Sequence, residues 1–419
     1  MSKWYSNTYR RNLVDMHIED WDDEFFSKFN VNKYYDNLVK AHIESPMIFL
    51  QSHVGLCYFP TKVAKMHNAF TKENKIKELT DKCKKAGMKV VGYYSLIFNT
   101  WAQNNHPKWA IRDYEGKTFI DIGQRYGLCC PNNMGYRKFV RTQIQEMADC
   151  YNNLDGIFYD MPYWEIACHC DTCKKRWAEE VGGEMPIKID WHNEIWKRYV
   201  RKRQEWMGEF AHYVEKISKE IMPLTTCELN FAAVVGCGWL AGSTESINDA
   251  CEFTGGDLYG DLYNHSFACK YYMGITKNPP FEYMTCRCNN NLREHTITKT
   301  EDMLANEVML TCAHHGASLV IDAIDPKGTL DSRVYDLVGK VFEKQMPYEK
   351  YFEGEYVSDV AVYFDSRTVY NSDNYEFCNK ECAIKTVRTL VENHILVSVI
   401  ANEHLNNIEK YKMIFAPAL

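Results

Sequence analysis

The sequence predicts an α/β fold in which a (β/α)8 barrel, the TIM barrel, is followed by the start of a flavodoxin-like α/β domain. Three observations support this prediction. Short apolar segments alternate with longer amphipathic ones, as strands and helices do in βα units. Eight expected strands fit within about 340 residues, a usual length for such a barrel with insertions. The same pattern then restarts after Tyr356.

The eight strands of the barrel are expected where apolar runs lack the alternation of a half-exposed strand, as in parallel sheets covered on both faces. We expect them at residues 13–18, 47–53, 89–95, 156–160, 224–230, 250–254, 281–285 and 317–322. Amphipathic helices are expected at 71–86, 135–151 and 191–220, and between 322 and 345. The barrel should therefore occupy residues 1–350.

A second domain is expected over residues 356–419. Strands at 360–364, 396–400 and 412–416 surround a helix at 381–393, the beginning of an open, doubly wound sheet. The sequence ends at Leu419, directly after a strand, and a sheet left with a bare edge and face is unfavourable. We therefore expect the native protein to continue beyond this residue.

Composition narrows the class of protein. The 419 residues carry a net charge of -7, from 49 basic and 56 acidic side chains, which argues against nucleic-acid binding. No apolar run approaches the roughly 18 residues of a membrane span, and residues 1–5 lack a signal-peptide core. The 17 cysteines then favour a cytoplasmic location, where clustered thiols are better explained as metal ligands than as disulfides.

Three cysteines have the spacing of metal ligands. Cys168, Cys170 and Cys173 form a C-x-C-x-x-C motif. A fourth thiolate from the loop after the third strand, Cys130 or its neighbour Cys129, would complete a structural zinc site with no open coordination position. His169 could replace one thiolate. The alternative is a set of unligated buried thiols.

Asp160 is the leading candidate for catalysis. It ends the apolar run 156–159, and Pro162 then stops the strand because proline has no N–H to donate. In a (β/α)8 barrel, the carboxyl ends of the strands form the active-site face. Tyr163 and Trp164 follow, and their flat rings suit a sugar face. The alternative is a structural aspartate that caps the next loop.

Nearly every expected strand ends in a polar residue. Such a ring of polar groups would be costly to bury without a ligand, and it suits a pocket that hydrogen-bonds sugar hydroxyls. Retaining glycosidases need a nucleophile and an acid/base about 5–5.5 Å apart. Asp160 suits the nucleophile. For the acid/base we rank Glu252, then Glu228, then Glu282, although each could instead bind substrate or form an ion pair. Further polar strand-end groups are His17, His53, Asn230, Asp257, Arg287 and Asp322.

Three short motifs resemble the α-L-fucosidases of glycoside hydrolase families twenty-nine and one hundred and fifty-one. They are Gln51-Ser52-His53-Val54-Gly55, residues 91–96 (Val-Gly-Tyr-Tyr-Ser-Leu) and residues 156–160 (Gly-Ile-Phe-Tyr-Asp). The resemblance implies a sugar-binding His53, an aromatic loop with Trp101, and Asp160 as nucleophile. Together with strand-end groups and the aromatic residues after Asp160, this makes the expected substrate-binding residues His17, His53, Trp101, Tyr163, Trp164, Glu282 and Arg287.

Other features are similar to family forty-two β-galactosidases. Cys130 together with Cys168, Cys170 and Cys173 resembles their zinc site. The segment after Tyr356 resembles their glutamine-amidotransferase-like trimerisation domain, which implies a homo-oligomer and, if the segment behaves like that domain, a trimer. In a β-galactosidase, the nucleophile would be a glutamate on the seventh strand, here Glu282. The Asn-Glu pair expected after the fourth strand is replaced by Trp164-Glu165, which argues against that assignment.

The sequence thus predicts a retaining exo-glycosidase that acts on a carbohydrate, with α-L-fucosidase as the leading activity. A β-galactosidase-like enzyme is the alternative within the same class. A barrel that binds sugar without hydrolysing it is the alternative outside that class.

Overall fold

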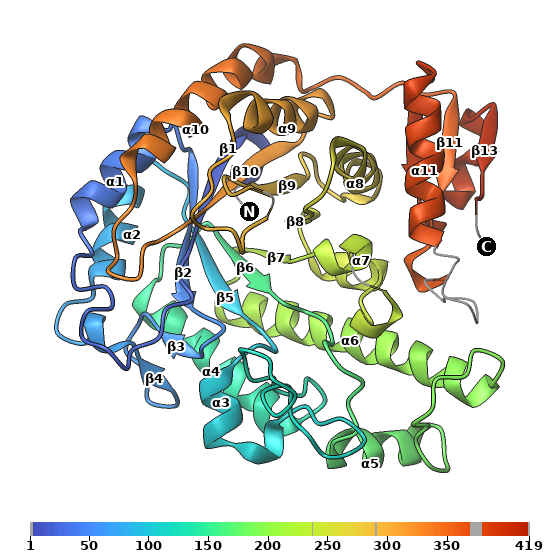
Figure 1. The fold of residues 1–419 in the computed structure, drawn as a ribbon, viewed down its shortest axis with the longest axis horizontal. Helices are drawn as coiled ribbons and strands as arrows, with labels where there is room; N and C mark the ends of the chain where they lie inside the picture. The colour runs from blue at the N-terminus through green and yellow to red at the C-terminus, as the bar shows by residue number, and fades with distance from the viewer. Residues whose placement is uncertain (1–2, 237, 290, 369–378, 418–419) are drawn as a thin grey trace.

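Eight parallel strands form the centre of the molecule, and helices surround them (Figure 1). The computed structural model describes residues 3–236, 238–289, 291–368 and 379–417. The strands are β1 (Arg10–Asp15), β2 (Ser45–Gln51), β5 (Val91–Ser95), β6 (Gly156–Asp160), β7 (Thr226–Leu229), β8 (Gly255–Asp257), β9 (Glu282–Cys286) and β10 (Ala317–Ala323). Their order is β7-β6-β5-β2-β1-β10-β9-β8, and a parallel bridge between Asn230 and Gly255 joins the two ends. The predicted TIM-like arrangement is confirmed.

Long helices cover the outside of the strands, and each begins at a side chain that accepts a hydrogen bond from the first turn. Asn30, Asn74, Asn133 and Asn193 cap four of them in this way. The covering helices are α1 (Val31–Lys40), α2 (Lys75–Lys85), α4 (Met134–Cys150), α6 (Glu194–Ile221), α8 (Leu262–Ile275), α9 (Glu301–Ala313) and α10 (Ser332–Gln345). Shorter elements lie in the connecting loops: β3 (Leu56–Cys57), β4 (Lys65–Met66), α3 (Thr100–Asn105), α5 (Asp171–Glu180) and α7 (Ala232–Gly236).

The sixth barrel strand was predicted at the wrong place. Residues 245–250 form a 3-10 helix, and the strand β8 follows at Gly255–Asp257 instead of 250–254. A Cβ atom on Gly255 would lie 1.8 Å from Oε1 of Glu228, so glycine is required at this position. Two glycines in a three-residue strand give no apolar signal, and the more apolar residues before them drew the prediction to the wrong segment.

A small parallel sheet follows the barrel, as predicted. Its strands are β11 (Val360–Tyr363), β12 (Val397–Ile400) and β13 (Met413–Phe415), in the order β12-β11-β13, with helix α11 (Asn379–Glu392) beside them. The sheet packs on α8 of the barrel. A Cβ on Gly274 of that helix would lie 2.7 Å from the Val399 carbonyl oxygen, so glycine permits the close contact. A role of this unit in trimerisation stays a prediction.

None of the helices that the structure describes is both long enough and apolar enough to cross a lipid bilayer.

Candidate active site

Asp160 lies at the carboxyl end of β6, and four groups surround its carboxylate. The Tyr93 hydroxyl donates a hydrogen bond to Oδ2. Asn230 Nδ2 and the Met161 backbone N–H donate to Oδ1 at 2.7 Å and 2.9 Å. Nε2 of His53 lies 3.7 Å from Oδ2. Met161 has a φ of 62°, a left-handed conformation that is uncommon for a residue other than glycine. The chain therefore turns sharply directly after the carboxylate.

The pKa of Asp160 is raised to about 6. Burial is the largest cause, and the nearby Asp257 carboxylate adds to it. Hydrogen bonds from Tyr93, Asn230 and Met161 favour the ionised form and oppose part of this shift. The carboxyl group is thus ionised at neutral pH and becomes protonated in mildly acidic solution.

Asp257, the last residue of β8, is the second carboxylate of the site. Asn230 Nδ2 donates to Oδ1 of Asp160 at 2.7 Å and to Oδ1 of Asp257 at 2.9 Å. The two carboxylate oxygens are therefore separated by no more than the sum of these distances, a range that includes the roughly 5–5.5 Å of retaining glycosidases. The Ala232 backbone N–H donates to Asn230 Oδ1 at 2.9 Å, which fixes the amide with its nitrogen toward both acids.

Sequence reasoning placed Asp257 in the ring of polar groups but did not rank it as an acid. The sequence predicts that the sixth strand ends at residue 254, which makes Glu252 its predicted strand-end acid. A Gly-Gly pair directly before an acid, Gly255-Gly256-Asp257, was the available signal.

His17 and His53 stack on each other beside Asp160, with ring centroids 3.7 Å apart. Burial lowers the pKa of both imidazoles well below the usual value, so both are neutral. The His53 backbone N–H donates to Nδ1 of His17, which leaves the ring proton of His17 on Nε2. The Ser95 hydroxyl donates to the Phe98 carbonyl and so accepts from Nδ1 of His53 at 2.6 Å. Nε2 of His53 is therefore a hydrogen-bond acceptor.

A cavity of about 50 Å³ lies beside these groups, and His53 is not among the residues that line it. Asp15, His17, Tyr93, Asp160, Asn230 and Asp257 line it, together with apolar side chains that include Tyr259 and Leu292. The cavity is small and partly open to solvent, so a bound monosaccharide would extend out of it or displace some of its lining side chains.

Glu228 and Glu282 lie deeper in the barrel and do not line this cavity. Glu282, the first residue of β9, forms a 2.9 Å ion pair with Arg11, and both side chains are 2% exposed. Oε1 of Glu228 accepts no hydrogen bond from any residue that the structure describes. Burial, followed by the charge of Glu282, raises the pKa of Glu228 well above its usual value. The two carboxyl groups are thus neighbours, and the charge of Glu282 disfavours ionisation of Glu228.

Glu252 lies before β8 and not at its carboxyl end. It forms an ion pair with Lys219 and accepts a hydrogen bond from the backbone N–H of Cys227, near the start of β7. The first-ranked acid/base of the sequence analysis is therefore at the end of the barrel opposite Asp160. The physical reason is the displaced sixth strand, and none of the three glutamates is brought to the cavity.

Of the three aromatic residues expected to bind substrate, one is buried and two are half-buried. Trp164 is 1% exposed, packs against the Arg203 guanidinium at 5.5 Å and donates to the Arg203 carbonyl, so it is a core residue. Trp101, half-buried on α3, stacks on Phe139 at 6.3 Å. Tyr163 is half-buried with its ring 6.2 Å from Phe98. None of the three expected aromatics lines the cavity.

Arg287 follows β9 and holds the loop beyond it. Its Nε donates to Asp322 at 2.8 Å, and its Nη1 donates to the His295 carbonyl at 2.7 Å. It does not line the cavity either, so the structure gives it a loop-fixing contact and no contact with Asp160.

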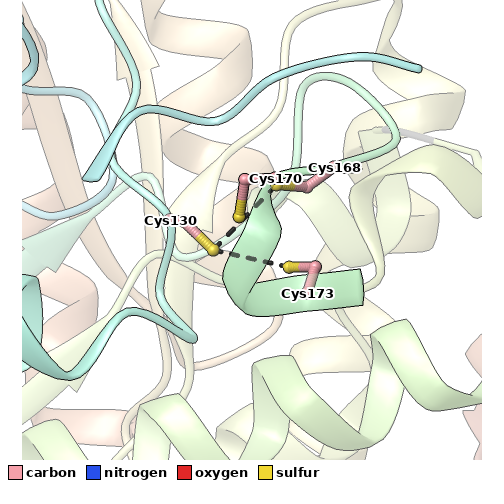
Figure 2. A group of neighbouring side chains, drawn as sticks. All are labelled: Cys130, Cys168, Cys170 and Cys173. Atoms are coloured by element: carbon pink, nitrogen blue, oxygen red, sulfur yellow. Dashed lines mark hydrogen bonds between the residues drawn. The ribbon is translucent and has the colours of Figure 1, made fainter. Parts of the chain in front are cut away.

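Four buried cysteines converge from two loops (Figure 2). Cys168 and Cys170 come from the segment before α5, Cys173 from its first turn and Cys130 from the loop after α3. Their sulfur atoms all lie within 4.8 Å of one another, with Cys130 3.5 Å from Cys173 and 4.0 Å from Cys168. A tetrahedral zinc with Zn–S bonds of about 2.3 Å separates its sulfurs by about 3.8 Å. The donor set therefore fits Zn²⁺ without large rearrangement.

Two neighbouring residues do not belong to this cluster. Cys129 Sγ lies 3.8 Å from the Asn99 carbonyl oxygen, so Cys130 is the fourth cysteine. Both ring nitrogens of His169 face carbonyl oxygens, those of Ala167 and Pro186. The grouping of Cys130 with the C-x-C-x-x-C motif is confirmed.

Known proteins share this architecture. The family model described as "Hypothetical glycosyl hydrolase 6" matches residues 30–161. The α-L-fucosidase isoenzyme 2 of Paenibacillus thiaminolyticus superposes with a TM-score of 0.79 at 20% identity over 97% of this chain. The β-galactosidase of Bacillus circulans sp. alkalophilus gives 0.73 at 15% identity over 98% of the chain. An α-L-fucosidase of Vibrio sp. strain EJY3 gives 0.51 at 13% identity over 83%.

The chain has a glycosyl hydrolase fold. It resembles both the α-L-fucosidases and the family forty-two β-galactosidases, as the sequence motifs predicted. It spans 59% of the Paenibacillus protein, 67% of the Bacillus protein and 55% of the Vibrio protein. No curated protein sequence matches it at a significant level.

Proposed function

We propose that this protein is a retaining exo-glycosidase with Asp160 as nucleophile and Asp257 as acid/base. The observation that carries the proposal is the shared amide of Asn230, which holds both carboxylates at one end of the barrel. Asp160 attacks the anomeric carbon while Asp257 protonates the departing oxygen. Asp257 then removes a proton from the water that releases the sugar.

The two histidines support a sugar as the ligand. Nε2 of His17 carries a proton and Nε2 of His53 carries a lone pair, so together they offer one donor and one acceptor. A hydroxyl group can both donate and accept, and it can thus satisfy the pair. A bound hydroxyl would also separate Nε2 of His53 from Oδ2 of Asp160, which lie 3.7 Å apart.

The leading substrate is a terminal α-L-fucosyl group. The sequence motifs around His53 and Asp160 and the likeness to the Paenibacillus protein support it, since that protein is an α-L-fucosidase. A β-galactosidase-like activity is the second candidate, because the fold is like that of a family forty-two β-galactosidase and the cysteine cluster resembles the zinc site of that family. We also propose that Cys130, Cys168, Cys170 and Cys173 hold a structural zinc that ties the two loops together.

A panel of aryl glycosides tests the proposal. Turnover of the α-L-fucoside by wild type, and its loss in Asp160→Ala with unchanged circular dichroism, is expected. Tyr163→Phe is a matched control near the site that should keep activity within about threefold, because that side chain does not line the cavity. Hydrolysis of the β-galactoside alone would transfer the assignment to the second candidate. Fucose binding without hydrolysis of any glycoside would leave a sugar-binding barrel.

A further inference from the structure

Tyr259 lines the catalytic cavity but has no role in the mechanism derived so far. It follows Asp257 by two residues, and both side chains line the cavity, whereas Leu258 between them does not. Successive side chains of an extended chain point to opposite sides, so this alternation places Tyr259 on the same side as the proposed acid/base. The Tyr283 hydroxyl donates to the Leu258 carbonyl at 2.6 Å, which holds the chain in this position.

The hydroxyl group of Tyr259 lacks a partner in the free protein. Its oxygen is buried and makes no hydrogen bond of ordinary geometry to any residue that the structure describes. The pKa of this hydroxyl is raised, mainly by burial and next by the charge of the nearby Asp257 carboxylate. The group therefore keeps its proton and can donate it to a hydrogen bond. Buried polar groups are nearly always paired, so an unpaired one beside a reacting centre suggests a partner that arrives with the ligand.

Position distinguishes Tyr259 from other tyrosines with unpaired hydroxyls. Within the part of the chain that the structure describes, four more buried tyrosine hydroxyls have no hydrogen-bond partner, and none of these side chains lines the cavity: Tyr136, Tyr199, Tyr272 and Tyr335. Only the Tyr259 hydroxyl can thus be paired by a substrate in this cavity.

The place of Tyr259 beside Asp257 indicates which substrate atom it meets. As the glycosidic bond breaks, negative charge builds on the glycosidic oxygen while Asp257 gives it a proton. This oxygen has two lone pairs, and one of them remains free for a second donor. A donor placed where charge develops stabilises the transition state more than the ground state. Tyr259 can turn toward this oxygen without breaking a hydrogen bond, so the movement costs little.

We propose that Tyr259 is a further catalytic residue, whose hydroxyl donates a hydrogen bond to the glycosidic oxygen that Asp257 protonates. The Tyr259 proton stays on its own oxygen throughout. The proton of Asp257 passes to the leaving oxygen, which also keeps the electron pair of the broken bond. This inference rests on the proposed function and adds a second donor at the bond that breaks.

Tyr259→Phe removes the hydroxyl and keeps the ring. Because the hydroxyl has no partner in the free protein, the urea midpoint of this variant should equal or exceed that of wild type. Tyr199→Phe is the matched control, since it removes another buried, unpaired hydroxyl from α6, away from the cavity. Both variants should keep the wild-type stability or gain some, and only Tyr259→Phe should lose activity. A lower urea midpoint for Tyr259→Phe alone would contradict the inference, because it would reveal a structural partner of the hydroxyl.

A series of aryl glycosides whose phenols differ in acidity locates the action of the hydroxyl. The sugar is the one that the wild type hydrolyses, α-L-fucose in the proposed function. We expect Tyr259→Phe to lower kcat/KM for the least acidic phenol by at least about tenfold, toward the roughly 10²–10³-fold typical of one lost oxyanion donor. The loss should shrink as the phenol becomes more acidic, because a better leaving group needs less stabilisation of its charge. Tyr199→Phe should keep the wild-type dependence.

An equal loss for every phenol would mean that Tyr259 acts elsewhere than at the leaving oxygen, and no loss would mean that it does not act at all. Either result would overturn the inference while the proposed function stands. Failure of the wild type to hydrolyse any aryl glycoside would overturn both.

Discussion

Asp160 and Asp257 accept hydrogen bonds from the same amide nitrogen, Nδ2 of Asn230. The two acids stand at the ends of β6 and β8, and Asn230 follows β7 between them. One side chain thus sets the spacing of two groups from different strands. The proposed mechanism depends on this spacing.

The raised pKa of Asp160 predicts the acid limb of the pH profile. The nucleophile must be ionised, so log(kcat/KM) should fall below a midpoint near the pKa of about 6. A flat profile down to about pH 4.5 would contradict the assignment of this group.

The same shift predicts a pH-dependent gain in stability from Asp160→Asn. Because the pKa is raised from the ordinary 3.8 to about 6 in the folded state, stability is lost as the pH rises from about 4 to about 6 and stays lower above that. The variant should therefore be more stable than wild type at about pH 8, by up to roughly 3 kcal/mol, with little difference near pH 4. Urea unfolding at both pH values measures the two free energies. If the variant and wild type differed in free energy of unfolding by the same amount at both pH values, the titration of Asp160 would not be the source of the difference.

Removal of the acid/base should affect substrates according to their leaving groups. We expect Asp257→Ala to lower kcat/KM by about 10²–10⁴-fold for an alkyl or sugar leaving group. Fluoride and nitrophenolate leave without protonation. For fucosides with these leaving groups, Asp257→Ala should therefore lower kcat/KM far less. Added azide should restore turnover and give a fucosyl azide of retained configuration. Identical losses for all leaving groups would exclude an acid/base role for Asp257.

The deep glutamates should respond to amide substitution in opposite ways. Burial and the charge of Glu282 raise the pKa of Glu228 and so disfavour its charged form, which a neutral amide does not have, so Glu228→Gln should retain activity and unfold within about 1 kcal/mol of wild type. Glu282→Gln removes the partner of the buried Arg11 and should cost about 3–5 kcal/mol. Denaturant titration of both variants provides the comparison. Selective loss of turnover in a stable Glu228→Gln protein would return Glu228 to the list of acid/base candidates.

The cysteine cluster should contain about one zinc per chain. Metal analysis of protein prepared without chelator should give this value, and Cys173→Ser should lose the metal and lower the Tm. Cys150→Ser is the control. That half-buried thiol lies outside the cluster, so its replacement should leave the zinc content and the Tm unchanged. A metal content near zero in the wild type would reject the site.

The fold could be predicted from the sequence because its signals are local. Apolar runs mark the strands, and Asp160 directly follows such a run, so its position at the active-site end was predictable. The spacing of Cys168, Cys170 and Cys173 identified the cysteine cluster in the same way, since three of its members are neighbours in the sequence.

The partner of Asp160 could not be predicted in this way. The strand that carries Asp257 contains two glycines, so periodicity gave no sign of it and Glu252 took its place. A glutamate reaches the carboxyl end of the barrel only if it stands late in its strand. Glu282 is the first residue of β9 and therefore lies at the other end. The burial of Trp164 beneath Arg203 was equally hidden, because a tryptophan suits a core and a sugar platform alike.

In the proposed mechanism Asp160 forms a covalent bond to the sugar, and this intermediate can be trapped. Incubation with 2-deoxy-2-fluoro-α-L-fucosyl fluoride, followed by proteolysis and tandem mass spectrometry, identifies the labelled residue. If Asp160 is the nucleophile, one label per chain is expected on Asp160 and none in Asp160→Asn. A label on Glu282 or any other carboxylate, in protein that turns over fucosides, would contradict it.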